Sequence, residues 1–141
     1  MMKEIASTAV LLAICIPALA VNMPDMVGNW TGNVHGVTYL KNTDYQTTGK
    51  PDFWEDNYTI AIDEQNGTRF SGKMNYDANP LNSMVVLGVI GSDNETIDLV
   101  KEDGYMWGSM NSPTEMALFA QAIDTNFMYV FEGNFTKEKP K

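Results

Sequence analysis

From residue 27 onward the sequence is a succession of short β-strand patterns, and this feature most constrains the fold. The dipeptide Asn66-Gly67 separates two runs in which apolar and polar residues alternate. Both residues tolerate the positive φ angles of a type I′ turn, so the pattern predicts a β-hairpin here. In the second run Phe70, Met74 and Tyr76 share one face, as expected of a strand with one buried side.

Eight such runs follow one another, mostly with tight connections and with no stretch of convincing helical period. They cover residues 27–38, 57–64, 68–76, 83–91, 95–101, 105–111, 114–123 and 126–136. The sequence therefore predicts an all-β fold, an eight-stranded antiparallel up-and-down (meander) β-barrel. A two-sheet sandwich is the main alternative, but its crossovers need longer connections.

The N-terminus has the features of a cleavable signal peptide. Lys3 supplies a positive charge, residues 5–16 are almost entirely apolar, and Pro17 precedes the small-x-small pattern of residues 18–20. Cleavage after Ala20 is the expectation from this pattern, and the protein is then secreted or displayed at the cell surface. The apolar run is short for a membrane span, although an uncleaved N-terminal anchor remains an alternative.

The signal peptide of residues 1–20 is thus expected to precede a barrel domain of residues 21–141 with no stable membrane span. Its removal would take away the single cysteine, Cys15, whose lipidation is a further alternative. The formal net charge of −9 argues against nucleic acid as a partner. Five N-x-Ser/Thr sequons also fit an exported glycoprotein. The candidate glycosylation sites are Asn57, Asn66, Asn94 and Asn134, whereas Asn29 lies within a predicted strand.

The segment Gly28-Asn29-Trp30 at the start of a meander resembles the calycins, the lipocalins and avidins. The resemblance implies a calycin-like barrel whose floor is closed by Trp30. Avidins place an Asn and a Ser where this chain has Gly32 and Gly36, so biotin binding is not expected.

The aromatic residues are the main candidates for ligand binding, because ligand pockets are mostly apolar. The candidate ligand-binding residues are Phe53, Trp54, Tyr58, Phe70, Tyr76, Tyr105, Trp107 and Tyr129. Phe53 and Trp54 fall in a long predicted connection, residues 39–56, and either cover a ligand or plug the barrel end. We therefore expect a secreted or cell-surface binding protein for a small apolar ligand. The alternative is a structural or protein-interaction module of the cell envelope with a filled barrel.

Small residues distinguish a hollow barrel from a filled one. The glycines at positions 72, 88, 108 and 133 leave room for a cavity if they face inward, and otherwise mark strand bends.

No residue pattern points to catalysis, a metal or a cofactor. His35 is the single histidine and has no partner at ligand spacing, and known nucleophile and phosphate-binding motifs are missing from the sequence. We therefore expect no enzyme, no cofactor and no catalytic residue. Asp98 and Glu132 fall in mid-strand and are expected to make interior polar contacts.

Two predicted strands are apolar on both faces. Val85, Leu87 and Val89 alternate with other apolar residues in 83–91, and Phe119 does so in 114–123. One face of each must be exposed, so the pattern predicts a homodimer or docking onto another protein through these strands.

Overall fold

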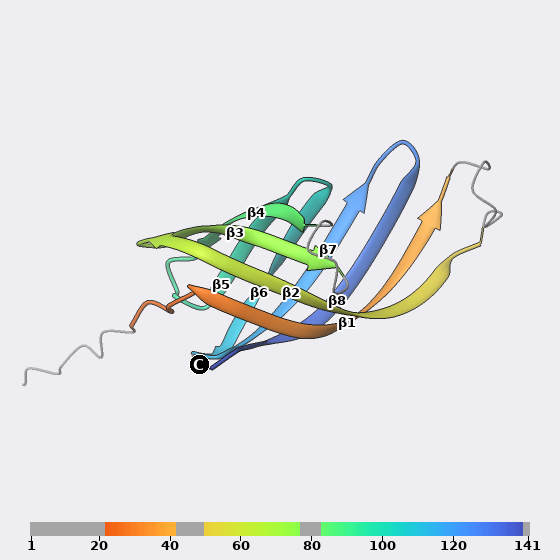
Figure 1. The fold of residues 1–141 in the computed structure, drawn as a ribbon. Coiled ribbons are helices and arrows are strands. Elements are labelled where there is room, and N and C mark those ends of the chain that lie inside the picture. The colour runs from red at the N-terminus through yellow and green to blue at the C-terminus, as the bar shows by residue number, and fades with distance from the viewer. Residues whose placement is uncertain (1–21, 42–49, 77–82, 140–141) are drawn as a thin grey trace, which may run out of the picture.

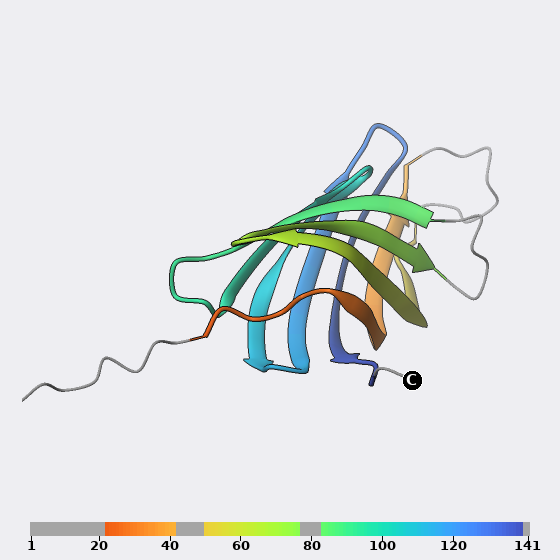
Figure 2. The ribbon, with the colours of Figure 1, turned by 60° about the vertical axis from the view of Figure 1, so that its left-hand side comes forward.

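The computed structural model describes residues 22–41, 50–76 and 83–139, which form a closed barrel of eight strands (Figure 1). The strands are β1 (Gly28–Leu40), β2 (Asp52–Asn66), β3 (Arg69–Tyr76), β4 (Ser83–Ile90), β5 (Thr96–Lys101), β6 (Gly104–Ser112), β7 (Glu115–Ile123) and β8 (Phe127–Lys137). Each pairs antiparallel with the next in sequence, and β8 closes the ring by pairing with β1. The second view shows how the strands wrap around a common interior (Figure 2).

The predicted eight-stranded meander barrel is therefore confirmed, together with the calycin-type architecture that the resemblance implies. Gly67 has a φ of 60° between β2 and β3, in agreement with the predicted hairpin. The strand bounds differ mainly in β2, which begins five residues before the predicted start. Phe53 and Trp54 thus lie in a paired strand, opposite Val37 and Gly36 of β1, and their placement in a loop is wrong.

Alternation along each strand separates an apolar interior from the outer face. Residues of all eight strands contribute to one buried core, in which Ile60, Met74, Met106 and Leu118 are fully enclosed. Burial of this continuous apolar surface is the main stabilising contribution to the barrel. The signal peptide and the predicted boundary at residue 20 lie outside the described residues.

The chain segment that precedes β1 closes one end of the barrel, which we call the floor. Met26 is fully buried there, and the indole Nε1 of Trp30 donates a hydrogen bond of 2.8 Å to its carbonyl oxygen. The side chain of Gln65 holds the same segment by accepting from the amide of Met26 at 2.7 Å and donating to the carbonyl of Pro24 at 2.9 Å. Trp30 therefore closes the floor, as the calycin resemblance implies.

Neighbouring groups fill the space beside the four glycines. A Cβ at Gly88 would overlap the ring of Phe70, and one at Gly133 would overlap Val34. At Gly72 and Gly108 the same position coincides with a backbone carbonyl of the adjacent strand. Side chains thus fill the interior beside Gly88 and Gly133, whereas at Gly72 and Gly108 the backbone of the adjacent strand lies too close for a side chain. Over the same residues, the structure contains no helix long and apolar enough to cross a membrane.

Candidate functional site

Four of the predicted ligand-binding residues gather inside the barrel at the end opposite the floor, which we call the mouth. Trp54 stacks on Tyr58 with ring centroids 6.0 Å apart, and Tyr58 meets the edge of Tyr76 at 4.8 Å. Tyr129 lies nearby and stacks on Phe131 at 5.9 Å. The indole of Trp54 also donates a hydrogen bond of 2.8 Å to the hydroxyl of Thr38, a contact that fixes its ring across the interior.

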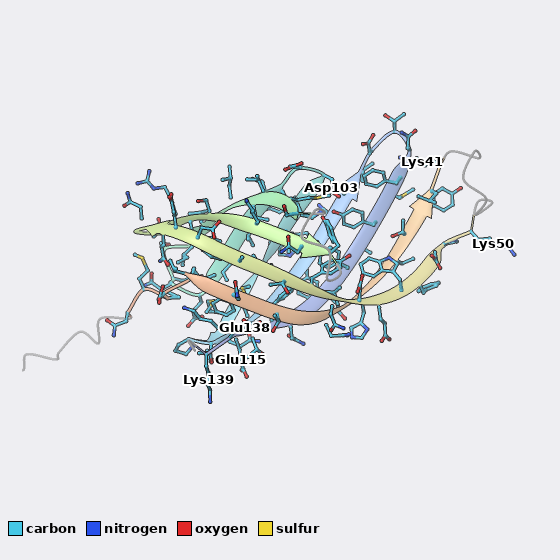
Figure 3. The ribbon with its side chains drawn as sticks, in the orientation of Figure 1. Lys41, Lys50, Asp103, Glu115, Glu138 and Lys139 are labelled. Atoms are coloured by element: carbon cyan, nitrogen blue, oxygen red, sulfur yellow. The ribbon has the colours of Figure 1, made fainter. Side chains whose placement is uncertain are left out.

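A buried lysine completes the mouth and was missed by the sequence reasoning. The side chain of Lys101 has no solvent exposure, forms an ion pair with Asp103 and donates to the hydroxyl of Tyr129. Its ammonium also lies 4.7 Å from the ring centroid of Tyr129 and 5.9 Å from that of Tyr76. Asp103 is labelled in Figure 3, at the barrel end opposite Glu115. The sequence did carry a signal that could have placed this lysine inside. Every second residue of the strand faces the interior, and the positions of Ile97 and Leu99 continue to Lys101.

Burial changes the protonation equilibria of the mouth. It lowers the pKa of Lys101, and the hydrogen bond and charge of Asp103 oppose this shift. Burial and the nearby carboxylate charges raise the pKa values of Tyr58, Tyr76 and Tyr129 above the ordinary tyrosine value. The mouth therefore holds neutral phenols around one satisfied ion pair. The ammonium of Lys101 already donates to Asp103 and Tyr129. Packing and charge compensation therefore explain this cluster of mouth residues.

The remaining predicted ligand-binding residues lie elsewhere. Phe70 belongs to the packed core, where its ring covers Gly88. Phe53, Tyr105 and Trp107 point outward from β2 and β6, and Phe53 is 81% exposed. The structure thus divides the eight aromatic residues between the mouth, the core and the outer surface.

The outward aromatic residues lead to a site that the sequence did not indicate. An open groove of about 480 Å3 runs across the outer face of β1, β8 and β7. Phe53 bounds it on one side and the stacked rings of Trp107 and Phe119, 6.0 Å apart, bound it on the other. Val37 and Val130, paired across β1 and β8, form its base.

The polar groups of this groove form one cross-strand row. Glu132 of β8 stands opposite His35 of β1, which stands opposite Glu55 of β2. His35 Nδ1 lies 3.3 Å from a carboxylate oxygen of Glu55, and both side chains are exposed. Glu132 and His35 line the groove itself.

The expectation of interior contacts for Asp98 and Glu132 is wrong. Glu132 is exposed on the outer face, and Asp98 accepts a hydrogen bond of 2.7 Å from the hydroxyl of Tyr105 there. Both strands alternate as predicted, and these carboxylates occupy the positions of opposite parity to the buried residues. The hydrogen bond from its hydroxyl to Asp98 raises the pKa of Tyr105.

The apolar outer surface extends beyond the groove. Val85, Leu87 and Val89 of β4 are exposed, as the two-sided apolarity of the strand predicted, and Val100 of β5 lies opposite Leu87. On β7, Phe119 is exposed while Met116 and Leu118 are buried. Exposed apolar residues thus occur on the outer faces of β4, β5 and β7.

The candidate glycosylation sites lie in strands and turns of the outer surface. Asn57 and Asn134 are exposed, each two residues closer to the floor than the Glu55–His35–Glu132 row. Asn66 precedes the β2–β3 turn, and Asn94 adopts a φ of 58° in the β4–β5 turn. Asp93 organises that turn, and a hydrogen bond from the Thr96 side chain is the largest cause that lowers its pKa to about 2.

Within the described ranges, the acidic residues and His35 form no cluster of three or more suited to a metal ion. The groove therefore presents apolar contact surface with two ionisable groups at its edge. Such a surface is suited to binding.

No protein-family model matches the sequence, and a comparison with curated proteins finds no match. Solved structures with related folds include a redesigned β-barrel, at 10% identity and a TM-score of 0.48 over 83% of this chain and 92% of the other. A de novo designed fluorescence-activating β-barrel is 14% identical, with a TM-score of 0.42 over 79% and 93% of the two chains. An S-type phycobiliprotein lyase from Guillardia theta is 11% identical, with a TM-score of 0.42 over 82% and 90%. Likenesses this distant bear on neither the ligand nor the activity of this chain.

Proposed function

We propose that this protein is an exported, non-enzymatic binding protein that takes a small apolar ligand in the outer groove between Phe53 and Phe119. The observation that carries the proposal is the groove itself. Its volume of about 480 Å3 falls within the range of about 300–1,000 Å3 that small-molecule sites occupy. Its lining is mostly apolar with two ionisable side chains, the composition expected of such a site.

The packed interior supports the outer location. Side chains fill the space beside Gly88 and Gly133, so a ligand at these positions in the core would have to displace Phe70 or Val34. A ligand in the outer groove instead covers the exposed surface of Phe53, Val130 and Phe119 without repacking the barrel. Removing that apolar surface from water supplies the driving force for binding.

The decisive experiment is native mass spectrometry of the protein purified from its own host, before and after organic extraction. We expect a discrete bound mass that extraction removes. Val130→Asn should lose this mass because Val130 forms the groove base. The matched control is Val100→Asn, since Val100 is 49% exposed against 51% for Val130 but lies on β5, outside the groove lining. Retention of the ligand by the Val130 variant, or a bare polypeptide mass for the unmodified protein, would contradict the proposal.

The exposed surface of β4 favours a second candidate, a protein-interaction module. Val85, Leu87 and Val89 form an apolar strip continued by Val100, which is of the kind that marks association surfaces. The predicted homodimer would bury this strip. Sedimentation analysis should then show a dimer that Val100→Asn dissociates and Val130→Asn does not. A monomer at all accessible concentrations would contradict the homodimer.

A further inference from the structure

Carboxylates are the acidic groups nearest the outer groove, and His35 stands between two of them. Following the barrel circumference, the paired residues run from Glu55 through His35 to Glu132, then through Phe119 and Trp107 to Asp98. Carboxylates therefore stand on both sides of the stacked aromatic pair. Among the described residues that line the groove there is one carboxylate, Glu132, and no lysine or arginine.

Several basic side chains are engaged elsewhere or lie on other strands. Lys41 donates a hydrogen bond of 2.8 Å to the carbonyl of Asp124 at the β7–β8 turn. Lys137 lies at the floor, 3.3 Å from a carboxylate oxygen of Asp25. Arg69 and Lys73 belong to β3, which pairs with β2 and β4 and contributes no residue to the groove lining. The net charge of −9 adds to a negative potential over this face.

From this arrangement we infer that the ligand of the groove is an amphiphilic organic cation, with its apolar body on Val130 and Phe119 and its ammonium group beside Glu132. This inference rests on the proposed function and specifies the chemical class of the ligand. A carboxylate beside an apolar wall acts in a lower effective dielectric than bulk water, so its attraction for a cation is strengthened. An anionic head group at the same place would meet repulsion from Glu132 and desolvation without a partner.

Three detergents with the same ten-carbon chain and different head groups test the inference. Decyltrimethylammonium, decyl maltoside and decyl sulfate would each be titrated into the full chain, below the concentration at which they form micelles and at physiological salt. Isothermal titration calorimetry gives the dissociation constants, and the intrinsic tryptophan fluorescence, to which Trp107 of the groove lining contributes, reports occupancy. We expect the cation to bind about tenfold more tightly than the maltoside, a difference that one partly screened charge pair supplies, and the sulfate to bind most weakly.

Glu132→Gln should reduce the preference for the cation, measured as the ratio of the maltoside and cation dissociation constants, to about threefold or less. The matched control is Glu115→Gln. Glu115 is an exposed carboxylate on β7, paired with Thr136 and outside the groove lining. This control removes the same formal charge and should preserve the tenfold preference.

The outcomes separate this inference from the proposal beneath it. Equal affinity for all three detergents, with binding lost in Val130→Asn, would overturn the cationic class and leave the groove as the binding site. An equal loss of preference in Glu115→Gln and Glu132→Gln would show that the net charge selects the cation, which also overturns the role of Glu132. Absence of binding by all three, or binding that Val130→Asn does not weaken, would contradict the groove as the site and the inference with it.

Discussion

Lys101 and Asp103 form an ion pair across the β5–β6 turn in which the lysine side chain is completely buried and the carboxylate is 25% exposed. This difference in exposure determines how much the free energy of unfolding falls when either residue is replaced. A lysine left without its carboxylate stays in the apolar interior, whereas an aspartate left without its lysine retains contact with water.

We therefore expect Asp103→Asn to destabilise the barrel more than Lys101→Met. The asparagine variant leaves a buried ammonium uncompensated and should lower the free energy of unfolding by about 2 to 3 kcal/mol. The methionine variant replaces the charge with an apolar side chain of similar length and should cost about 1 kcal/mol or less. Urea denaturation of both variants measures the difference. Equal losses would show that the exposure of Asp103 does not matter.

The mouth tyrosines should remain protonated in the folded protein well above the ordinary tyrosine pKa of about 10. Burial raises the pKa values of Tyr58, Tyr76 and Tyr129, so folded chains keep three protons that unfolded chains release. The free energy of unfolding should consequently fall as the pH rises above about 10. The lowered pKa of Lys101 has the opposite effect, because below the ordinary lysine pKa of about 10.4 it makes the free energy of unfolding rise with pH. This contribution comes from one group, whereas three tyrosines contribute to the fall.

Near-ultraviolet absorbance of phenolate, recorded in native buffer and in denaturant, tests the tyrosine prediction. The native protein should show fewer ionised tyrosines than the denatured chain at the same alkaline pH. Substituting all three mouth tyrosines by phenylalanine should abolish most of the pH dependence of stability. Full ionisation in the native state at the ordinary pKa would contradict the prediction.

Trp30→Phe should open the floor of the barrel. The phenyl ring fills less volume and leaves the carbonyl of Met26 without the 2.8 Å hydrogen bond that the indole donates. We expect the free energy of unfolding to fall by about 2 kcal/mol. Trp107→Phe is the matched control, since Trp107 lies on the outer surface and its replacement should cost about 0.5 kcal/mol or less. Chemical denaturation of both variants compares the two positions, and similar losses would mean that the floor contact is not needed.

Gly88→Ala tests whether the core is filled at β4. The added methyl group would overlap the ring of Phe70, so we expect a loss of about 1 to 3 kcal/mol. In a Phe70→Leu background the smaller side chain leaves room, and the same alanine substitution should cost less. A double-mutant cycle on thermal or urea unfolding gives this coupling. Additive effects would indicate that the space beside Gly88 is open.

Much of the fold follows from local sequence. Asn66-Gly67 sets a hairpin through backbone angles that these two residues tolerate, and period-two alternation places Phe70 and Met74 inside because their neighbours are polar. Alternation also requires one apolar face of residues 83–91 to be exposed, and the structure shows that this is the face of Val85 and Leu87. These features depend on residues a few positions apart, so the sequence by itself determined the eight strands and their order.

The start of β2 could not be fixed in this way. Phe53 and Trp54 stand among acidic residues that are uncommon in strands, and only pairing with Val37 and Gly36 of β1 holds them extended. Their opposite directions follow from that pairing, with Trp54 inside the mouth and Phe53 on the outer surface.

The sequence indicated Phe53 and Trp107 as ligand-binding residues, but only the tertiary structure brought them into one site. The groove joins Phe53, Phe119 and Val130 from three strands, and these residues come together only because β8 pairs with β1 and closes the barrel. Alternation within a strand indicates that a side chain points outward, but it does not indicate which residues of other strands stand beside it. Register and closure supply that information, because they are set by the packing of the whole core.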